Sequence, residues 1–347
     1  MEAKVLYRLL DANLNRACEG LRVLEDVARF MLGDATLSKT IRGARHELRR
    51  AAPNLPGDLL SARDVSGDFG TAYREASHLG TSSFVTANAR RVQEAARVLE
   101  ETARCLMPEA VETFKRTRFL AYELEQDLVR RAHLTEKAEF LNNLRLYVIV
   151  GTSHTGSRPV PDVVREAIRG GAGLIQLREK QLPARSFLEL ARLLRDITNE
   201  GGVPLIINDR VDIAAASGAD GVHLGQEDLP VSAARRILGY RAIIGVSAHS
   251  VAEAVAAEQD GADYVGVGPV FATTTKPELE PKGLLLLNAV LQAVHVPVVA
   301  IGGINRENVA SVVGAGVNRV AVVSAVAGAP DVAGSAAMML KILEGSN

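Results

Sequence analysis

A short apolar run near residue 175 ends in a row of hydrogen-bond donors. Residues 176–180 read Gln-Leu-Arg-Glu-Lys, and the alternation of side chains along a strand sends Gln176, Arg178 and Lys180 to one side. Guanidinium and ammonium groups form charge-assisted hydrogen bonds with phosphate oxygens, so this row suits a phosphorylated ligand. A solvated strand edge is the competing interpretation.

A second polar stretch follows another apolar run. Thr273, Thr274 and Thr275 stand before Lys276, directly after the run GVGPVFA at 266–272. Three hydroxyl groups and a cation after a buried strand are typical of a phosphate-binding loop, although a solvated loop would also favour threonine. The two polar stretches together predict two anion sites.

Two carboxylates belong to the same group of strand ends. Asp209 follows the run PLIIN at 204–208, and Asp228 follows GVHLGQE at 221–227. Magnesium is held in proteins by one or two carboxylates and completes its shell with water and substrate phosphates, so this pair is a candidate Mg²⁺ site. Capping of the following helix is the alternative role for Asp228.

The elements that must position these residues begin at Leu146. Short β-rich runs alternate with amphipathic helical segments, and the runs are 146–150, 174–178, 204–209, 221–224, 242–248, 264–270, 297–303 and 319–326. Eight strand–helix units in about 200 residues predict a compact (β/α)8 TIM barrel. An open doubly wound sheet is the second choice, because no dinucleotide glycine fingerprint follows the first strand.

In a barrel of this kind the carboxyl ends of the strands meet at one face, where the active site lies. Asn208 and Ser247 end two further strands, and Gly302, Gly303 and Ser324 follow the last two. A glycine turn and backbone amides after the seventh and eighth strands are a common phosphate cradle. The sequence thus predicts a metal-bound diphosphate and a separate monophosphate at one mouth.

Residues 1–142 have a different, helical periodicity and form the predicted first domain, ahead of the barrel at 143–347. The segment 13–29 repeats at 88–104, with Asn13 aligned to Asn88, Arg16 to Arg91, Glu19 to Glu94 and Arg22 to Arg97. Such self-similarity predicts duplicated helices in a mainly α-helical domain. Shared packing and a shared functional face both explain the repeat.

Composition excludes several classes of protein. The chain has 347 residues, a formal net charge of -1 and two cysteines. The net charge gives no bulk positive field that would favour nucleic-acid binding. Two cysteines are too few for a disulfide framework or a thiolate zinc site. No apolar run approaches the ~20 residues of a membrane helix. We expect a cytoplasmic protein with small-molecule substrates and no nucleic-acid or membrane partner. The sequence is compatible with a homo-oligomer and does not fix the oligomeric state.

The order and spacing of these motifs resemble thiamine-phosphate synthase over about residues 144–343. The resemblance rests on QLREK (176–180), ND (208–209), GVHLGQED (221–228), GVSAHS (245–250), GPVFATTTK (268–276), AIGGI (300–304) and VVSAV (322–326). It implies a transferase that joins a hydroxymethylpyrimidine diphosphate to a thiazole phosphate, giving thiamine phosphate and diphosphate by a dissociative, Mg²⁺-dependent substitution.

The resemblance also implies roles for individual positions. The pyrimidine diphosphate would be bound by Gln176, Leu177, Arg178, Glu179, Lys180, Asn208, Ser247 and Lys276. The thiazole phosphate would be bound by Thr273, Thr274, Thr275, Gly303, Val323 and Ser324. Mg²⁺ would be held by Asp209 and Asp228. Catalysis would fall to Arg178, Lys180, Ser247 and Lys276.

The N-terminal domain resembles the ThiD2 type through LDANLNRACEGLRVLEDVARF (10–30), RDVSGDFGT (63–71) and NARRVQEAARVLEE (88–101). That family is associated with phosphorylation of hydroxymethylpyrimidine phosphate, and Asp64 and Asp68 are candidate Mg²⁺ ligands. Three alternatives stay open: a thiazole tautomerase-like isomerase on the barrel, a ligand-sensing barrel without turnover, and a helical dimerisation module at the N-terminus.

Overall fold

The computed structural model describes residues 2–51, 80–273 and 280–345. The chain forms two compact units, Met1–Thr135 and Glu136–Asn347. The second unit begins before the predicted boundary at 142, because the end of the last N-terminal helix packs with the barrel. Asp64 and Asp68, proposed above as metal ligands, lie outside the described residues. In the described part of the chain, no helix combines the length and hydropathy that crossing a membrane requires.

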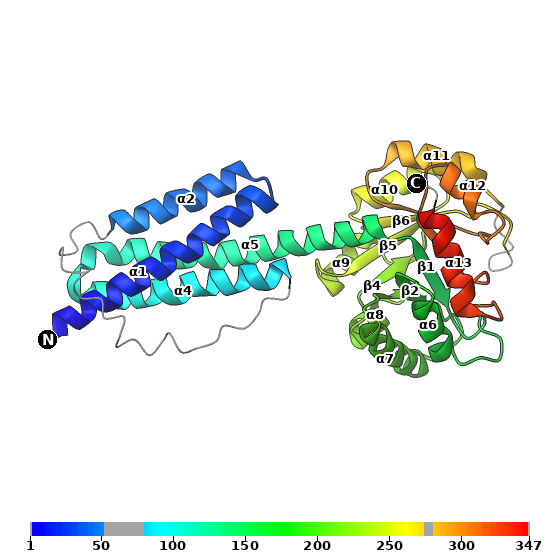
Figure 1. Cartoon of the computed structure of the whole chain (residues 1–347), viewed down its shortest axis with the longest axis horizontal. Helices are drawn as coiled ribbons and strands as arrows, with labels where there is room; N and C mark the ends of the chain where they lie inside the picture. Colours follow the sequence, from blue (N-terminus) through cyan, green and yellow to red (C-terminus); the bar gives the residue numbers. More distant parts are fainter. Residues whose placement is uncertain (1, 52–79, 274–279, 346–347) are drawn as a thin grey trace. The chain divides into compact units, whose positions relative to one another are not determined.

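The first unit is helical, as predicted (Figure 1). Its elements are α1 (Glu2–Asp26), a π-helical turn (Val27–Met31), α2 (Ala35–Arg50), α4 (Thr81–Leu106), a 3₁₀ turn (Pro108–Ala110) and α5 (Val111–Asn143), whose last residues belong to the second unit. The apolar stripe of α1 is fully buried at Ala17, Leu21 and Leu24. Asp34 caps α2 by accepting a 2.8 Å hydrogen bond from the Leu37 amide.

The repeated pattern has matching geometry in its two copies. The side-chain amides of Asn13 and Asn88 donate to the carbonyls four residues earlier, at 2.8 and 2.9 Å. Glu25 and Glu100, 75 residues apart like the asparagines, are each 1% exposed and each accept hydrogen bonds from two arginines. These positions serve packing. Arg16, Glu19 and Glu94 are exposed, so this part of the repeat stays a candidate functional face.

The second unit is a closed barrel of parallel strands paired in sequence order from β1 to β8, with β8 pairing β1. The strands are β1 (Leu146–Val150), β2 (Leu174–Leu177), β3 (Leu205–Asn208), β4 (Gly221–Leu224), β5 (Ile243–Ala248), β6 (Tyr264–Val267), β7 (Val298–Ile301) and β8 (Val320–Val322). The predicted TIM barrel is confirmed and the open sheet is excluded. Strands β6 to β8 end earlier than predicted, for example where Gly302 turns the chain out of β7 with a φ of 101°.

The helices that follow the strands cover the outside of the barrel (Figure 1). They are α6 (Val160–Arg169), α7 (Ala184–Glu200), α8 (Val211–Ser217), α9 (Val231–Leu238), α10 (Val251–Gln259), α11 (Gly283–Ala293), α12 (Val309–Gly314) and α13 (Val332–Glu344). Their apolar faces and the outward side chains of the strands form the larger core. Side chains directed into the barrel form a second, smaller core.

The end of α5 belongs to this inner core. Leu141 and Leu144 are buried with inward side chains of the strands, among them Tyr147 and Tyr264. Lys137, 8% exposed, pairs with Asp263 at 2.6 Å and donates to two backbone carbonyls. Burial lowers the pKa of Lys137, although the charge of Asp263 opposes this. The end of α5 therefore contributes to the inner core of the barrel.

Candidate active site

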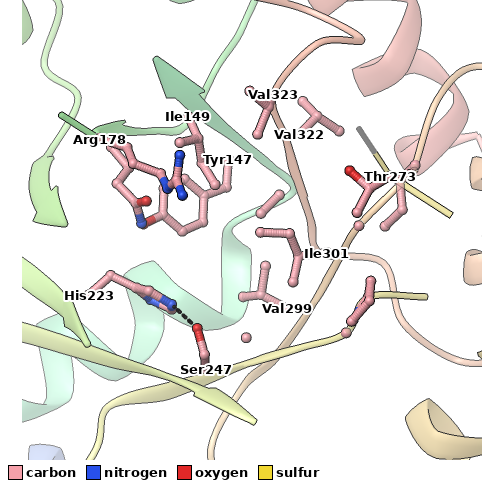
Figure 2. Close-up of a pocket in the computed structure, with 18 of the residues that line it drawn as sticks. Tyr147, Ile149, Arg178, His223, Ser247, Thr273, Val299, Ile301, Val322 and Val323 are labelled. Atoms are coloured by element: carbon pink, nitrogen blue, oxygen red, sulfur yellow. Dashed lines mark hydrogen bonds between the residues drawn. The ribbon is translucent and has the colours of Figure 1, made fainter. Parts of the chain in front are cut away.

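A cavity lined by both polar and apolar side chains opens among the residues at the carboxyl ends of the strands (Figure 2). Its empty volume, counted together with open solvent at the mouth, is about 940 Å³. The predicted site residues that line it are Gln176, Arg178, Asn208, Ser247, Thr273, Gly303, Val323 and Ser324. Thr274, Thr275 and Lys276 lie outside the described residues.

The donor row begins in β2 and continues into the loop after it, and part of the row lines the cavity. Gln176 and Arg178 line the cavity, as the alternation predicts. Leu177 points the other way and is fully buried in the outer core, so only its backbone can face a ligand. Lys180 lies in the loop after β2 with its side chain half exposed, and it pairs with Asp209.

Glu179 holds the loop that follows β1. Its carboxylate accepts hydrogen bonds from the Thr152 amide at 2.6 Å and from the Thr152 hydroxyl at 2.9 Å. A Cβ on Gly151 would lie 2.2 Å from the carbonyl oxygen of Arg178, so only glycine fits between the two loops. Glu179 thus fixes the backbone next to Arg178, and both oxygens of its carboxylate are already engaged.

The two aspartates predicted to bind metal lie close enough to interact. Asp209 has a φ of 62°, a left-handed conformation that a non-glycine residue adopts at a cost. Asp228 accepts a 2.6 Å hydrogen bond from the Gly225 amide within its own loop. The helix that follows, α9, has Pro230 at its N-cap and no side-chain cap. The alternative role of Asp228 as a helix cap is therefore not seen.

The charges around this pair suit a cation. Burial raises the pKa of Asp228, and the hydrogen bond and charge of Asp209 raise it further, against the opposing effects of the Gly225 amide and Lys180. A cation such as Mg²⁺ between Asp228 and the neighbouring carboxylate of Asp209 would stabilise the charged form of Asp228. Among the described residues, no group of three or more His, Cys, Asp or Glu could hold a metal ion.

Ser247 takes part in a hydrogen-bonded chain that the sequence did not reveal. Its hydroxyl lies 2.9 Å from His223 Nε2, and His223 Nδ1 lies 2.9 Å from the hydroxyl of Tyr264. That hydroxyl is 3.0 Å from the hydroxyl of Tyr147, which accepts a hydrogen bond from Gln176 at 2.5 Å. Ser250, not Ser247, caps α10 by accepting from the Glu253 amide. Tyr147, His223 and Tyr264 are the site residues that sequence reasoning missed.

The opposite side of the cavity carries the candidate phosphate cradle. Figure 2 shows Thr273 and Val323 across the cavity from Arg178. Gly303 has a φ of 66°, and a Cβ there would lie 2.3 Å from the carbonyl oxygen of Ala272. Only glycine therefore allows the turn after β7 to approach the segment that leads into Thr273. The Gly303 carbonyl accepts a 2.9 Å hydrogen bond from the side chain of Asn308, which fixes the turn.

A closed parallel barrel with a cavity at its carboxyl face defines the class: a (β/α)8-barrel enzyme. The family model described as thiamine monophosphate synthase matches residues 146–326, and the ThiD2 family model matches residues 8–127. The chain belongs to the thiamine monophosphate synthase family and is an enzyme of the transferase class. Both family resemblances seen in the sequence are confirmed.

Relatives agree over both parts of the chain. A protein of Gloeobacter violaceus named thiamine-phosphate synthase is 42% identical and covers 99% of this chain and 98% of its own length. The protein of that name from Moorella thermoacetica is 51% identical over 57% of this chain and 95% of its own length. The solved thiamine phosphate pyrophosphorylase of Pyrococcus furiosus is 43% identical, with a TM-score of 0.55 over 59% of this chain and 98% of that structure.

Proposed function

We propose that the barrel is a thiamine-phosphate synthase that joins 4-amino-2-methyl-5-(diphosphooxymethyl)pyrimidine to the ethyl phosphate of a methylthiazole, with or without a carboxyl group. The observation that carries the proposal is one cavity with a donor row on one side, at Gln176 and Arg178, and a glycine-built turn on the other, at Gly303. Two phosphorylated substrates can therefore meet between them.

The reaction exchanges one bond at the exocyclic carbon of the pyrimidine. The carbon–oxygen bond breaks, diphosphate leaves with the electron pair, and the thiazole nitrogen then donates its lone pair to the same carbon. An electron-rich aminopyrimidine stabilises the intermediate cation. The protein needs no nucleophile of its own; it stabilises the leaving group and places the nitrogen.

The residues divide according to these tasks. Arg178, Lys180 and Lys276 stabilise the negative charge of the departing diphosphate. Asp209 and Asp228 would hold Mg²⁺, which supplies further charge neutralisation on the phosphate oxygens. The pyrimidine diphosphate is also bound by the backbone of Leu177, and Glu179 supports the loop beside it. Gln176, Asn208 and Ser247 contact the pyrimidine ring. The thiazole phosphate is bound by Thr273, Thr274, Thr275, Gly303, Val323 and Ser324.

Arg178→Met tests this division. We expect kcat/KM with the pyrimidine diphosphate to fall at least about 10²-fold, because a preorganised cation at developing negative charge is lost. The matched control is Arg165→Met on the exposed face of α6, where Arg165 pairs with Asp162. Equal activity of the Arg178 variant and the control would contradict the proposal.

The alternatives give different products in the same assay. A thiazole tautomerase-like isomerase would convert the thiazole phosphate without any pyrimidine substrate, and a ligand-sensing barrel would bind both compounds without turnover. Neither uses the carboxylate pair. Asp209→Asn is therefore expected to abolish diphosphate release while leaving the described cavity able to bind the thiazole phosphate.

We propose further that the N-terminal part phosphorylates hydroxymethylpyrimidine phosphate to the diphosphate, so that residues 1–142 and 143–347 are two functional domains. The ThiD2 match over 8–127 supports this proposal. The full chain, incubated with hydroxymethylpyrimidine phosphate, ATP and Mg²⁺, should form the hydroxymethylpyrimidine diphosphate. Phosphorus NMR detects this product. Asp209→Asn should keep this activity. If both proteins make none, the helical part is a scaffold, and its role as a dimerisation module is then tested by the solution mass of the chain.

A further inference from the structure

Five polar side chains from five different strands form one continuous hydrogen-bonded chain inside the barrel. In order they are Gln176 on β2, Tyr147 on β1, Tyr264 on β6, His223 on β4 and Ser247 on β5. All five line the cavity, and Figure 2 shows the link between His223 and Ser247 with Tyr147 close by. We call these five side chains the relay.

The barrel makes room for the relay at two glycines. A Cβ on Gly245 would lie 2.0 Å from Cζ of Tyr264, and a Cβ on Gly266 would lie 3.1 Å from Cε1 of His223. The ring of Tyr264 packs edge-on against Tyr147 with centroids 6.1 Å apart, and lies 5.6 Å from the ring of His223. The three rings are thus held in fixed positions beneath the ligand-binding region.

Counting protons gives the relay a direction. Burial raises the pKa of Tyr147 and of Tyr264, so both hydroxyls keep their protons. The nitrogen of the Gln176 side chain donates to Tyr147 and cannot accept. Tyr147 must therefore give its own proton to Tyr264, because that is its remaining partner.

The same reasoning continues through the histidine. Tyr264 accepts from Tyr147 and gives its proton to Nδ1 of His223. A neutral ring then carries its hydrogen on Nε2, which donates to the oxygen of Ser247. The hydroxyl hydrogen of Ser247 is left to point at a ligand. At the other end, the amide oxygen of Gln176 is left to accept from one.

We propose that the relay fixes the polarity of the pyrimidine site, so that Gln176 presents an acceptor and Ser247 presents a donor. The inference rests on the proposed function, because it takes the ligand between the two ends to be an aminopyrimidine, which offers an amino group to an acceptor and a ring nitrogen to a donor. Tyr147, Tyr264 and His223 are positioning residues in this account, since they act through Gln176 and Ser247.

Reversal of the relay is possible only as a unit. If the Gln176 amide turned over, its oxygen would accept from Tyr147, every proton along the chain would shift by one place, and Ser247 would donate to His223. Both ends would then show the wrong group to an aminopyrimidine. The tautomer of His223, with hydrogen on Nε2 or on Nδ1, therefore reports the state of the whole relay.

The test uses the full chain labelled with ¹⁵N in its seven histidines. Nitrogen NMR distinguishes the two tautomers, and a His223→Gln variant identifies the signal. We expect the Nε2–H tautomer in the wild-type protein, unchanged when the pyrimidine diphosphate binds. The Nδ1–H tautomer, or a mixture of the two, would overturn the proposal without any measurement of activity.

Tyr264→Phe removes one hydroxyl from the middle of the relay while keeping the ring. The expected result is a mixture of His223 tautomers and a KM for the pyrimidine diphosphate raised about 5- to 150-fold, the range for a buried polar group left unpaired. The KM for the thiazole phosphate should not change. Tyr240→Phe, the same change outside the relay, is the control.

The outcomes separate this inference from the proposed function. A Tyr264→Phe variant with a single Nε2–H tautomer and unchanged KM values would overturn the relay while thiamine phosphate is still made. A wild-type chain that makes no thiamine phosphate would instead contradict the proposed function. Should Tyr264→Phe fail to fold, the tautomer of the wild-type protein still decides the question.

Discussion

Gly245→Ala should damage the site through a single added methyl group. The new Cβ would lie 2.0 Å from Cζ and 2.4 Å from the hydroxyl oxygen of Tyr264. Carbon atoms in contact lie about 3.5–4.0 Å apart, so the ring must move by about 1.5 Å. Tyr264 holds its two relay partners at 3.0 and 2.9 Å, and a shift of this size breaks at least one of the two hydrogen bonds.

The expected loss of stability has two sources. Overpacking a filled core costs about 1–3 kcal/mol, and leaving a buried hydroxyl without its partner costs about 1–3 kcal/mol more. Hydrogen exchange of β5 and β6, measured by mass spectrometry on the full chain, reports the free energy of opening. The KM for the pyrimidine diphosphate should rise in the same variant.

Gly314→Ala is the matched control, because a Cβ there would meet nothing within 4 Å. A second comparison tests the cause directly. Tyr264→Leu removes the atoms that clash, so Gly245→Ala should destabilise the protein less in the Tyr264→Leu background than in the wild type. Equal effects in the two backgrounds would refute the reasoning, since the methyl group would not be meeting Tyr264.

Three further outcomes follow from the structure. Asp263→Ala leaves Lys137 and Arg235 without their shared carboxylate and should destabilise β5 and β6 by about 3–5 kcal/mol, measured by hydrogen exchange. Lys137→Met leaves Asp263 paired with Arg235 and should therefore destabilise these strands less. Burial would raise the pKa of Glu25, but the hydrogen bond from Arg42 and nearby arginine charges lower it overall. The ionised Glu25 therefore stabilises the fold above the unfolded pKa of about 4.3, and this contribution is lost as pH falls through the lower folded pKa. Glu25→Gln should weaken the protection of the α1 amides from hydrogen exchange at pH 7 and make that protection less dependent on acid pH. Chelation of divalent cations should stop diphosphate release, and added Mg²⁺ should restore it; activity that persists in chelator would contradict the role of the aspartates.

Much of the barrel could be predicted because its information is local. Continuous apolar runs such as LYVIV at 146–150 give strands, and side-chain alternation correctly sends Gln176 and Arg178 into the cavity. The same alternation directs the side chain of Leu177 into the outer core. The family resemblance names Leu177 as a binding residue without separating its backbone from its side chain. The place of the end of α5 in the barrel could not be predicted in this way, because the partners of Lys137 lie far along the chain.

The relay could not be predicted, since it depends on which strands meet in space. Tyr147, His223 and Tyr264 each stand in an apolar run, and nothing in any one run shows that the three rings touch. One signal was available: a polar aromatic residue in each of three buried strands, with Gly245 in β5, between β4 and β6, and Gly266 in β6 itself. Glycine within a strand often marks the close approach of another group.

The most direct test of the central claim is the stoichiometry of the reaction. The full chain, supplied with the pyrimidine diphosphate, the thiazole phosphate and Mg²⁺, is followed by phosphorus NMR. Our account predicts one diphosphate released for each thiamine phosphate formed, and neither product when one substrate is left out. Diphosphate without thiamine phosphate, or a change in the thiazole phosphate alone, would contradict it.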